Sequence, residues 1–286
     1  MLSKLPLKIA RRIIGNLQKL TSKMLLMRKS DFVGKLIHLP DFPSSAASQD
    51  QFIDITLRGA RENYTALADF VSEKTLICSD IEDFHITFNE TKQALRLGDL
   101  FKYYGSDKAS THNYHFLYSK LMNLETTTFN ILEIGLGSNN TDTPSNMGKY
   151  GKPGASLRAW RDFKENIYVT GADIDERILF QEDRIETYQL DQTLQFSWDQ
   201  FLSKLGKSTF DLIIDDGLHA PLANLLTVRN LISKLNPGGV LVIEDIGIQA
   251  LPIWRLFQII TEKIMNVEIV KSKMAYLVLV RQKNNS

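Results

Sequence analysis

The sequence is poor in cysteine. Cys78 is the one cysteine among 286 residues, which excludes an intrachain disulfide and argues against a cysteine-based zinc site. So little cysteine fits a reducing compartment, and we expect a cytoplasmic location. A chain of this length removes about three quarters of its unfolded surface from water, so it can fold without covalent cross-links.

The N-terminal end lacks acidic residues and long apolar runs. Its longest apolar run, Met24–Met27, is far shorter than the roughly 18 residues of a transmembrane span or the roughly 7–15 of a signal-peptide core. Residues 1–30 instead carry eight basic side chains. Apolar residues recur there at three- and four-residue steps: Leu5, Ile9, Ile13, Leu17, Leu20 and Met24. This pattern predicts a basic amphipathic helix.

Three interpretations of this helix stay open. It packs on the rest of the chain or on another subunit, it binds an anionic surface at the inner face of the membrane, or it is a transit peptide. Membrane binding gains about 1 kcal/mol for each Lys or Arg close to anionic lipid. The other 256 residues hold 26 basic and 33 acidic side chains. That acidic balance argues against nucleic acid as a partner.

Apolar segments alternate with helical patterns from Phe129 onward. We expect strands at 130–135, 167–173, 184–190, 210–215, 239–244, 267–271 and 275–281, and helices at 157–164, 198–204, 222–235 and 254–265. Continuous apolar strands separated by helices predict an α/β fold with a parallel sheet covered on both faces. The last two strands are joined by a few residues, so they should form an antiparallel hairpin.

Glycines and carboxylates follow the first three strands, at the edge of the sheet where α/β proteins bind ligands. Gly135 and Gly137 permit a tight turn and close approach to a ligand. Asp173 ends the second strand, where it can accept both ribose hydroxyls, and Asp191 follows the third strand near the expected adenine. Each residue alone also suits an ordinary turn or helix cap. A third glycine at dinucleotide spacing is missing, so S-adenosylmethionine fits better than NAD.

Four carboxylates follow the fourth and fifth strands, which should be neighbours. They are Asp215, Asp216, Glu244 and Asp245. Burying like charges together is costly, and a hard divalent cation removes that cost. We expect Asp216, Glu244 and Asp245 to bind Mg²⁺. Asp215 either faces the cofactor or holds the loop.

His219 lies three residues beyond Asp216. Its ordinary pKa lets it take a proton near neutral pH, from a substrate hydroxyl that the metal orients. The alternative is a capping turn with a surface histidine. The matching carboxylates after the fifth strand favour the catalytic interpretation.

Five segments, in this order, resemble class I S-adenosylmethionine-dependent methyltransferases: ILEIGLG, GADID, LDQ, FDLIIDDGLH and LNPGGVLVIEDI. The pairing of DDGLH with IEDI is similar to the Mg²⁺-dependent sugar O-methyltransferases of macrolide biosynthesis, the mycinamicin type. It is also similar to the cephalosporin hydroxylase and rhamnosyl O-methyltransferase group. GASLRAW (154–160) and YYGSDKASTHNYHFLY (103–118) resemble further stretches of the macrolide enzymes. The resemblance covers about residues 100–282.

The resemblance implies a Rossmann-like sheet in the order 3-2-1-4-5-7-6, with the last strand antiparallel and a helical N-terminal extension. We divide the chain into a basic helix at 1–30, an auxiliary region at 31–100 and a methyltransferase domain at 101–286. The resemblance also implies roles for residues named above and for Glu133: the cofactor lies among Glu133, Gly135, Asp173 and Asp191, Mg²⁺ binds to Asp216, Glu244 and Asp245, and His219 is the general base. His112 and Tyr114 are candidates to reach the same site.

The expected function is Mg²⁺-dependent methyl transfer from S-adenosylmethionine to a sugar hydroxyl, in glycan or polysaccharide biosynthesis or on a glycosylated metabolite. A catechol or other phenol is the alternative acceptor. The incomplete glycine fingerprint argues against an NAD-linked oxidoreductase, and the intact acidic cluster argues against a non-catalytic membrane adaptor. Relatives of this type often assemble through their N-terminal parts, so we expect a homo-oligomer.

Overall fold

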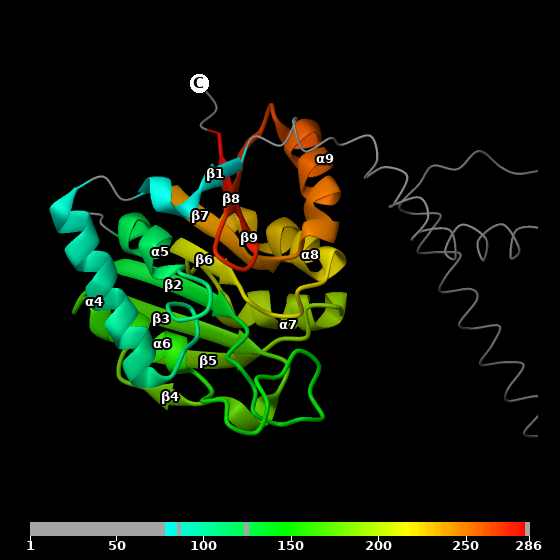
Figure 1. Ribbon diagram of the computed structural model, residues 1–286. Helices are drawn as coiled ribbons and strands as arrows, with labels where there is room; N and C mark the ends of the chain where they lie inside the picture. Colours follow the sequence, from blue (N-terminus) through cyan, green and yellow to red (C-terminus); the bar gives the residue numbers. More distant parts are fainter. Residues whose placement is uncertain (1–77, 85–86, 123–125, 284–286) are drawn as a thin grey trace, which may run out of the picture. The chain divides into compact units, whose positions relative to one another are not determined.

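Residues 78–84, 87–122 and 126–283 are described by the structure, a computed structural model. They form three layers, with a sheet between two groups of helices (Figure 1). The predicted helix at 1–30 and most of the predicted region 31–100 lie outside the described residues. Among the helices that are described, none has the length and apolar character needed to cross a membrane.

The described strands form one sheet in the order β1-β8-β9-β7-β6-β2-β3-β5-β4. Their bounds are β1 Cys78–Asp80, β2 Phe129–Ile134, β3 Ile167–Asp173, β4 Gln181–Glu182, β5 Ile185–Gln189, β6 Phe210–Asp215, β7 Leu235–Ile246, β8 Met265–Lys271 and β9 Tyr276–Gln282. The strands from β5 to β8 reproduce the predicted order 3-2-1-4-5-7-6. β9 runs antiparallel to both β7 and β8, so the predicted hairpin is confirmed.

Two strands extend the sheet beyond the predicted seven. β1 pairs in parallel with β8, where Ser79 Oγ donates a hydrogen bond of 3.0 Å to Glu268 Oε1. β4 pairs antiparallel with β5 at the opposite edge. β7 also begins earlier than predicted, at Leu235, because a register shift between Phe210 and Leu212 accommodates residues 236–239 within the pairing of β6 and β7.

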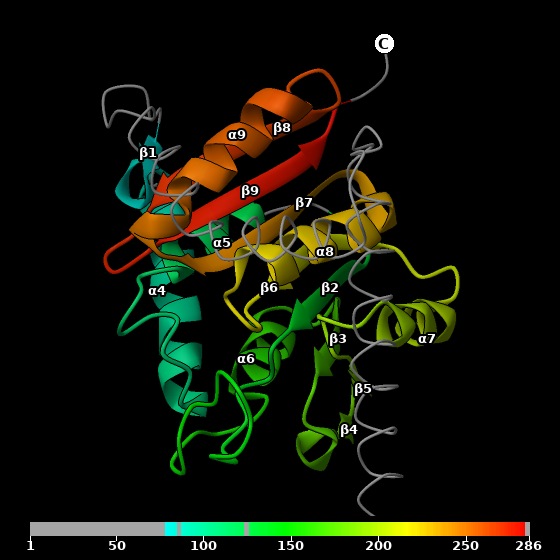
Figure 2. The ribbon, with the colours of Figure 1, turned by 90° about the vertical axis from the view of Figure 1, so that its right-hand side faces the viewer.

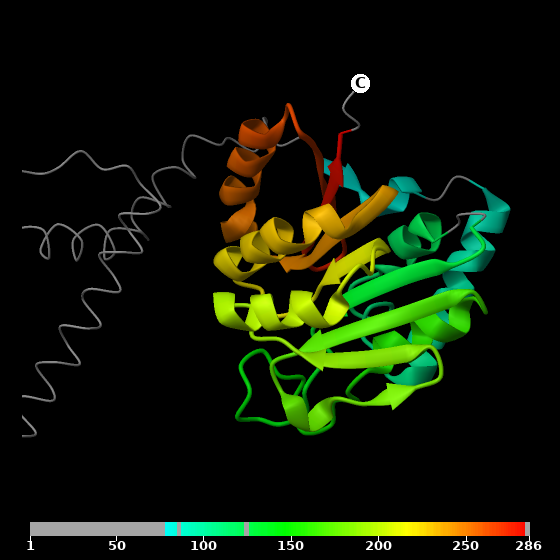
Figure 3. The same ribbon diagram turned by 180° about the vertical axis from the view of Figure 1, so that it is seen from behind.

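Helices cover both faces of the sheet. α4 Phe88–Tyr104, α5 His115–Leu121 and α6 Ala155–Phe163 lie on one face, and α7 Gln195–Leu205, α8 Pro221–Leu231 and α9 Leu251–Thr261 lie on the other (Figures 2 and 3). Short 3-10 helices occupy Ile81–Phe84, Glu176–Ile178, Ile232–Lys234 and Ile248–Ala250. The third of these replaces the last turn of the predicted helix at 222–235.

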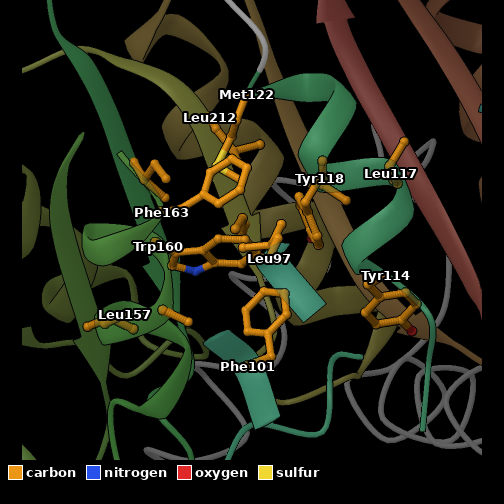
Figure 4. Close-up of a cluster of buried hydrophobic side chains, with 14 of the residues drawn as sticks. Leu97, Phe101, Tyr114, Leu117, Tyr118, Met122, Leu157, Trp160, Phe163 and Leu212 are labelled. Atoms are coloured by element: carbon orange, nitrogen blue, oxygen red, sulfur yellow. The ribbon is translucent and has the colours of Figure 1, made fainter. Parts of the chain in front are cut away.

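α4 runs across the predicted domain boundary between residues 100 and 101. It begins with a capping box, in which Thr87 Oγ1 accepts a bond of 3.3 Å from the Glu90 amide and the Glu90 carboxylate accepts one of 2.9 Å from the Thr87 amide. Leu97 and Phe101 stand on either side of the boundary and belong to the same buried cluster as Trp160 (Figure 4). The folded domain therefore includes residues upstream of 101.

A separate apolar cluster covers each face of the sheet. On the α4–α5–α6 face, the Trp160 ring packs edge-on against Phe101 and Tyr118, with centroids 4.6 and 5.0 Å away. On the other face, Trp198 and Trp254 are fully buried. The strands are thus covered on both sides, which explains their continuous apolar runs. Because β2, β3, β5, β6 and β7 run parallel, their carboxyl ends lie together at one edge of the sheet.

Candidate active site

A cavity of about 550 Å³ opens at the carboxyl ends of β2, β3, β5, β6 and β7. Most of the predicted site residues line it: Gly135, Gly137, Asp173, Asp191, Asp216, His219, Glu244 and Asp245. Glu133 and Asp215, both predicted near the cofactor, are fully buried and lie outside this lining.

The glycine turn after β2 packs against the backbone of Asp216, which follows β6. Gly135 has φ 93°, and a Cβ there would come within 2.0 Å of the Asp216 carbonyl oxygen. The Asp216 amide in turn donates a bond of 2.8 Å to the Ile134 carbonyl. Gly137 has φ 77° and lies in the cavity wall under the Met147 side chain. Gly135 is therefore required by the close approach of the chain's own backbone.

Two carboxylates at the end of β3, those of Asp173 and Asp175, make different contacts. Asp173 lines the cavity while its oxygens accept bonds from the amides of Leu136 (2.7 Å) and Asp175 (2.9 Å). Burial raises the pKa of Asp173, and these backbone bonds act in the opposite direction. The Asp175 carboxylate is occupied instead by Ser138 Oγ (2.6 Å) and Asn140 Nδ2 (2.7 Å). Asp175 thus holds the loop that follows β2.

Hydrogen bonds link the residues at the ends of β5 and β6. Asp191 Oδ1 accepts the Thr193 amide at 2.8 Å. Gln192 Nε2 donates to Asp215 Oδ1 at 2.8 Å, and Gln192 Oε1 accepts the Leu218 amide at 3.0 Å. Of the two roles predicted for Asp215, holding the loop is the one that this arrangement supports.

Glu133 is fully buried and does not line the cavity. Its carboxylate accepts a bond of 2.7 Å from Ser156 Oγ and a second bond from Trp160 Nε1, both on α6. The Lys108 ammonium lies 3.4 Å from Oε1, the same oxygen that accepts from Ser156. Burial raises the pKa of Glu133, while Lys108 and the two hydrogen bonds lower it. The structure thus assigns Glu133 to the packing between β2 and α6.

Lys108 occupies the centre of the acidic cluster. Its Nζ donates to Asp216 Oδ2 at 2.5 Å and also to Glu244 Oε2. The residue is 2% exposed. Burial by itself lowers the pKa of Lys108, but Asp216, Glu244 and Glu133 raise it well above its usual value. The side chain is therefore a buried cation.

Glu244, predicted to be a metal ligand, contacts two other side chains of the acidic cluster. One of its oxygens accepts from Lys108 Nζ and the other accepts from the Tyr118 hydroxyl. Burial raises its pKa, and the Lys108 charge lowers it. Both Glu244 oxygens are thus committed to groups of the protein itself.

Asp245 contacts His112 and Tyr114, the two residues that the sequence suggested could reach the site. The Tyr114 hydroxyl donates to Asp245 Oδ1 at 2.5 Å, and His112 Nδ1 lies 3.3 Å from the same oxygen. Burial, followed by the charges of Glu244 and Asp245, raises the pKa of Tyr114, so the phenol keeps its proton and donates it. The expectation that His112 and Tyr114 reach the site is confirmed.

Asp216, His219 and Asp245 form the group of potential metal ligands within the described residues. One ligand atom from each lies within 4.8 Å of the others. His219 Nε2 is 3.8 Å from Asp216 Oδ1 and 3.9 Å from Asp245 Oδ2. These two oxygens are not the ones bonded to Lys108 and Tyr114. Two carboxylate oxygens facing an imidazole at a cavity wall fit a hard divalent cation.

Sequence reasoning missed Lys108 and Tyr118, which lie in the segment 103–118 that the resemblance singled out. Neither had a predicted role. A signal was available, because four carboxylates carry more negative charge than one divalent cation neutralises. A further basic residue had to be close to them.

Comparisons with known proteins agree with the resemblance in the sequence. No model of a known protein family matches the chain. The 8-demethyl-8-alpha-L-rhamnosyl tetracenomycin-C 2'-O-methyltransferase of Streptomyces olivaceus is 31% identical over 144 residues, which are 50% of this chain and 35% of that protein. The mycinamicin VI 2''-O-methyltransferase of Micromonospora griseorubida is 34% identical over 118 residues, 40% of this chain and 26% of that protein. The chain thus matches about a third or less of the length of these relatives.

A solved structure has the same architecture. The MycE methyltransferase from the mycinamycin biosynthetic pathway, in complex with Mg and SAH, superposes with a TM-score of 0.53 at 24% identity. The match covers 66% of this chain and 55% of that one. The chain therefore has the class I methyltransferase fold, and its predicted resemblance to sugar O-methyltransferases is confirmed.

Proposed function

We propose that the chain is an S-adenosylmethionine- and Mg²⁺-dependent O-methyltransferase that acts on a sugar hydroxyl of a glycan or glycosylated metabolite. The observation that carries the proposal is the meeting of Asp216, His219 and Asp245 in one cavity with Gly137 and Asp173. The relatives named for methylation of a rhamnosyl group and of mycinamicin VI support a sugar acceptor. The neighbour with bound Mg and SAH supports the two cofactors.

The residues that line the cavity have different proposed roles. Asp173 and Asp191, at the ends of β3 and β5, hold the nucleoside. Asp216 and Asp245 are the residues that would hold the cation, and each has a carboxylate oxygen within 4 Å of His219. When bound, the two cofactors supply the transferable methyl group and a positive charge that favours ionisation of the acceptor hydroxyl. His219 Nε2 lies between the two carboxylates and accepts the proton of that hydroxyl.

We infer that the loop after β2 limits the access of water to this reaction. Ser145 and Met147 belong to the cavity wall, and Asp175 ties the beginning of the loop to the end of β3. Exclusion of water strengthens the electrostatic interactions of the acidic cluster and holds the acceptor close to the methyl donor.

We also propose that residues 1–30 hold the enzyme at the cytoplasmic face of an anionic membrane and that the enzyme is a homo-oligomer. The eight basic side chains and the apolar stripe of that segment support membrane binding. Co-sedimentation with vesicles containing phosphatidylserine tests it: binding should fall as salt rises, and no binding at low salt would refute it. Analytical ultracentrifugation tests the oligomer.

Calorimetric binding of S-adenosylhomocysteine, with NAD⁺ in parallel, tests the proposed activity at its first step. We expect S-adenosylhomocysteine to bind and NAD⁺ not to bind. Asp173→Asn should weaken the binding of S-adenosylhomocysteine at least tenfold. Asp99→Asn, a change at an exposed carboxylate of α4, is the matched control and should bind normally. The unchanged protein should then methylate rhamnosyl acceptors with Mg²⁺ and fail in EDTA. Binding of NAD⁺ instead, or full activity in EDTA, contradicts the proposal.

A further inference from the structure

The side-chain amide of Gln192 joins the ends of β5 and β6 to α8. Its Nε2 donates to Asp215 Oδ1 at 2.8 Å and to Thr227 Oγ1 at 2.9 Å, and its Oε1 accepts the Leu218 amide at 3.0 Å. We propose that Gln192 is a positioning residue for His219, whose imidazole it orients through the backbone of Leu218. This inference rests on the proposed function for the role of His219 as a general base.

The imidazole of His219 lacks the hydrogen bond that usually orients a catalytic base. Its Nδ1 is buried and has no hydrogen-bond partner among the described residues. Its Nε2 is 3.8 Å from Asp216 Oδ1 and 3.9 Å from Asp245 Oδ2, which is beyond hydrogen-bond distance. In most enzymes with a catalytic base, a third group bonded to the base fixes its direction. Here the direction of the ring depends on the backbone that carries it.

The backbone immediately before His219 is held by Gln192 and its partner Asp215. The Leu218 amide donates directly to Gln192 Oε1. The Gly217 amide donates at 3.3 Å to Asp215 Oδ1, the oxygen that also accepts from Gln192 Nε2. His219 itself has φ 56°, a conformation that persists where the surrounding structure imposes it. Removal of the Gln192 amide should therefore release the turn that keeps His219 in this conformation.

Gln192 is itself firmly placed. It is 6% exposed, and its two N–H donors are both used, one by Asp215 and one by Thr227. The Trp198 indole also donates to the Gln192 carbonyl at 2.9 Å. A Cβ at Gly217 would lie 2.1 Å from Gln192 Oε1, so the amide is in close contact with the loop backbone. A fixed side chain in such contact can transmit its position to the loop.

Nuclear magnetic resonance of the His219 ring tests the inference without measuring activity. The Cε1–H signal of His219, identified by its loss in His219→Ala, reports the surroundings of the imidazole. Gln192→Leu keeps the approximate size of the side chain and removes its hydrogen bonds, so we expect it to shift and broaden this signal. In the methyltransferase assay, kcat of this variant should fall about 10²-fold, as expected for a misplaced reacting group, while KM for the acceptor changes less than about threefold.

Thr227→Val covers the case in which Gln192→Leu does not fold. Thr227 is fully buried on α8 and does not line the cavity, so its hydroxyl can affect His219 through its bond to Gln192. We expect a smaller shift of the same signal. Thr261→Val is the matched control, because Thr261 is also buried on a helix and also donates to the carbonyl four residues earlier. Its His219 signal should match that of the parent.

The His219 signal decides this inference, and methyl transfer by the parent decides the proposed function. A shift in Gln192→Leu or Thr227→Val, with none in the control, supports the positioning of His219 by Gln192. It does so even if the parent transfers no methyl group, in which case the role of His219 as a base is wrong. An unchanged signal in the folded variants, or an equal shift in Thr261→Val, overturns the inference and leaves the proposed function standing.

Discussion

His219 and Asp245 adopt a backbone conformation that residues other than glycine rarely adopt. Their φ angles are 56° and 55°. Such residues cost of order 1–3 kcal/mol each and persist where the surrounding structure imposes them. Here the conformation turns both side chains into the cavity after β6 and within β7. The strain at these two residues thus accompanies their place in the proposed catalytic cluster.

Replacement of His219 by alanine should slow catalysis more than it weakens cofactor binding. We expect a loss of about 10²–10⁴-fold in kcat, the usual contribution of a general base. The dissociation constant of S-adenosylhomocysteine should change less than threefold, because His219 faces the two carboxylates rather than the β3 and β5 ends. Steady-state kinetics and calorimetry measure the two quantities. Parallel losses in both would show that His219 only shapes the site.

The sequence predicted which carboxylates and histidine lie together at the site, but not which side chains of the protein contact them. Asp216, His219 and Asp245 could be placed together because the ends of parallel strands meet at one edge of a sheet. The contact between Glu244 and Lys108 could not be predicted, because the two residues are 136 positions apart and the position of the ammonium depends on the packing of α4 and α5. Short sequence motifs do not carry such long-range pairings.

At the scale of elements, one carboxylate holds the loop that follows β2. Asp175 accepts bonds from Ser138, Asn140 and Thr143 in the loop, and it pairs with Arg177 on the other side. Asp175 therefore anchors the loop, residues of which line the cavity.

Asp175→Asn should loosen the loop and weaken cofactor binding. The amide keeps the size of the side chain but loses the charge that attracts Arg177. We expect S-adenosylhomocysteine to bind about tenfold more weakly, with a lower melting temperature. Asp142→Asn is the matched control, because Asp142 pairs with the same arginine from an exposed position and should matter little. Equal effects of the two substitutions would contradict a special role for Asp175.

The contribution of Asp175 should also depend on pH. Its bond to Arg177, followed by its bonds to Ser138 and Asn140, lowers its pKa in the folded state. A lowered carboxyl pKa stabilises the fold above the unfolded value of about 3.9 and loses this effect as pH falls through the folded value. The difference in melting temperature between parent and Asp175→Asn should be constant near neutral pH and shrink below about pH 4. A difference that grows on acidification would contradict this assignment.

Prediction of the elements succeeded where apolar runs were long and failed where they were short. β3 and β6 have the predicted bounds, because their buried apolar residues continue along the whole strand. β1 and β4 are three and two residues long, too short to carry a pattern. Their pairing is decided by the neighbouring strands β8 and β5, which only the folded sheet supplies.

On the scale of the whole molecule, the folded domain is larger than the motif-bearing part of the sequence. The resemblance began at about residue 100, where recognisable motifs begin. In the structure, α4 contributes to the buried apolar cluster, and β1 belongs to the same sheet as the motif-bearing strands. A boundary drawn from motifs therefore cuts through a helix that packs on α6.

A chain that begins at residue 101 should be much less stable than one that begins at Cys78. The shorter chain loses β1, the 3-10 helix that begins with the buried Ile81, and most of α4 with the buried Leu97. Truncating one buried Leu or Ile to Ala already costs about 2–5 kcal/mol, comparable to the stability of many domains. Circular dichroism and urea unfolding of the two chains measure the difference. Equal unfolding midpoints would show that the motif-bearing part folds alone.

The pairing of β1 with β8 has a consequence for the order in which the protein is made. Ser79 and Glu268, bonded across these strands, are 189 positions apart in the chain. At about 5–20 residues per second, a ribosome makes the second roughly 10–40 s after the first. During that interval β1 has no strand to join, and the sheet that grows behind it ends in an open edge. The nascent chain therefore pairs the edge strand β1 late in synthesis, although β1 is made before the other strands that the structure describes.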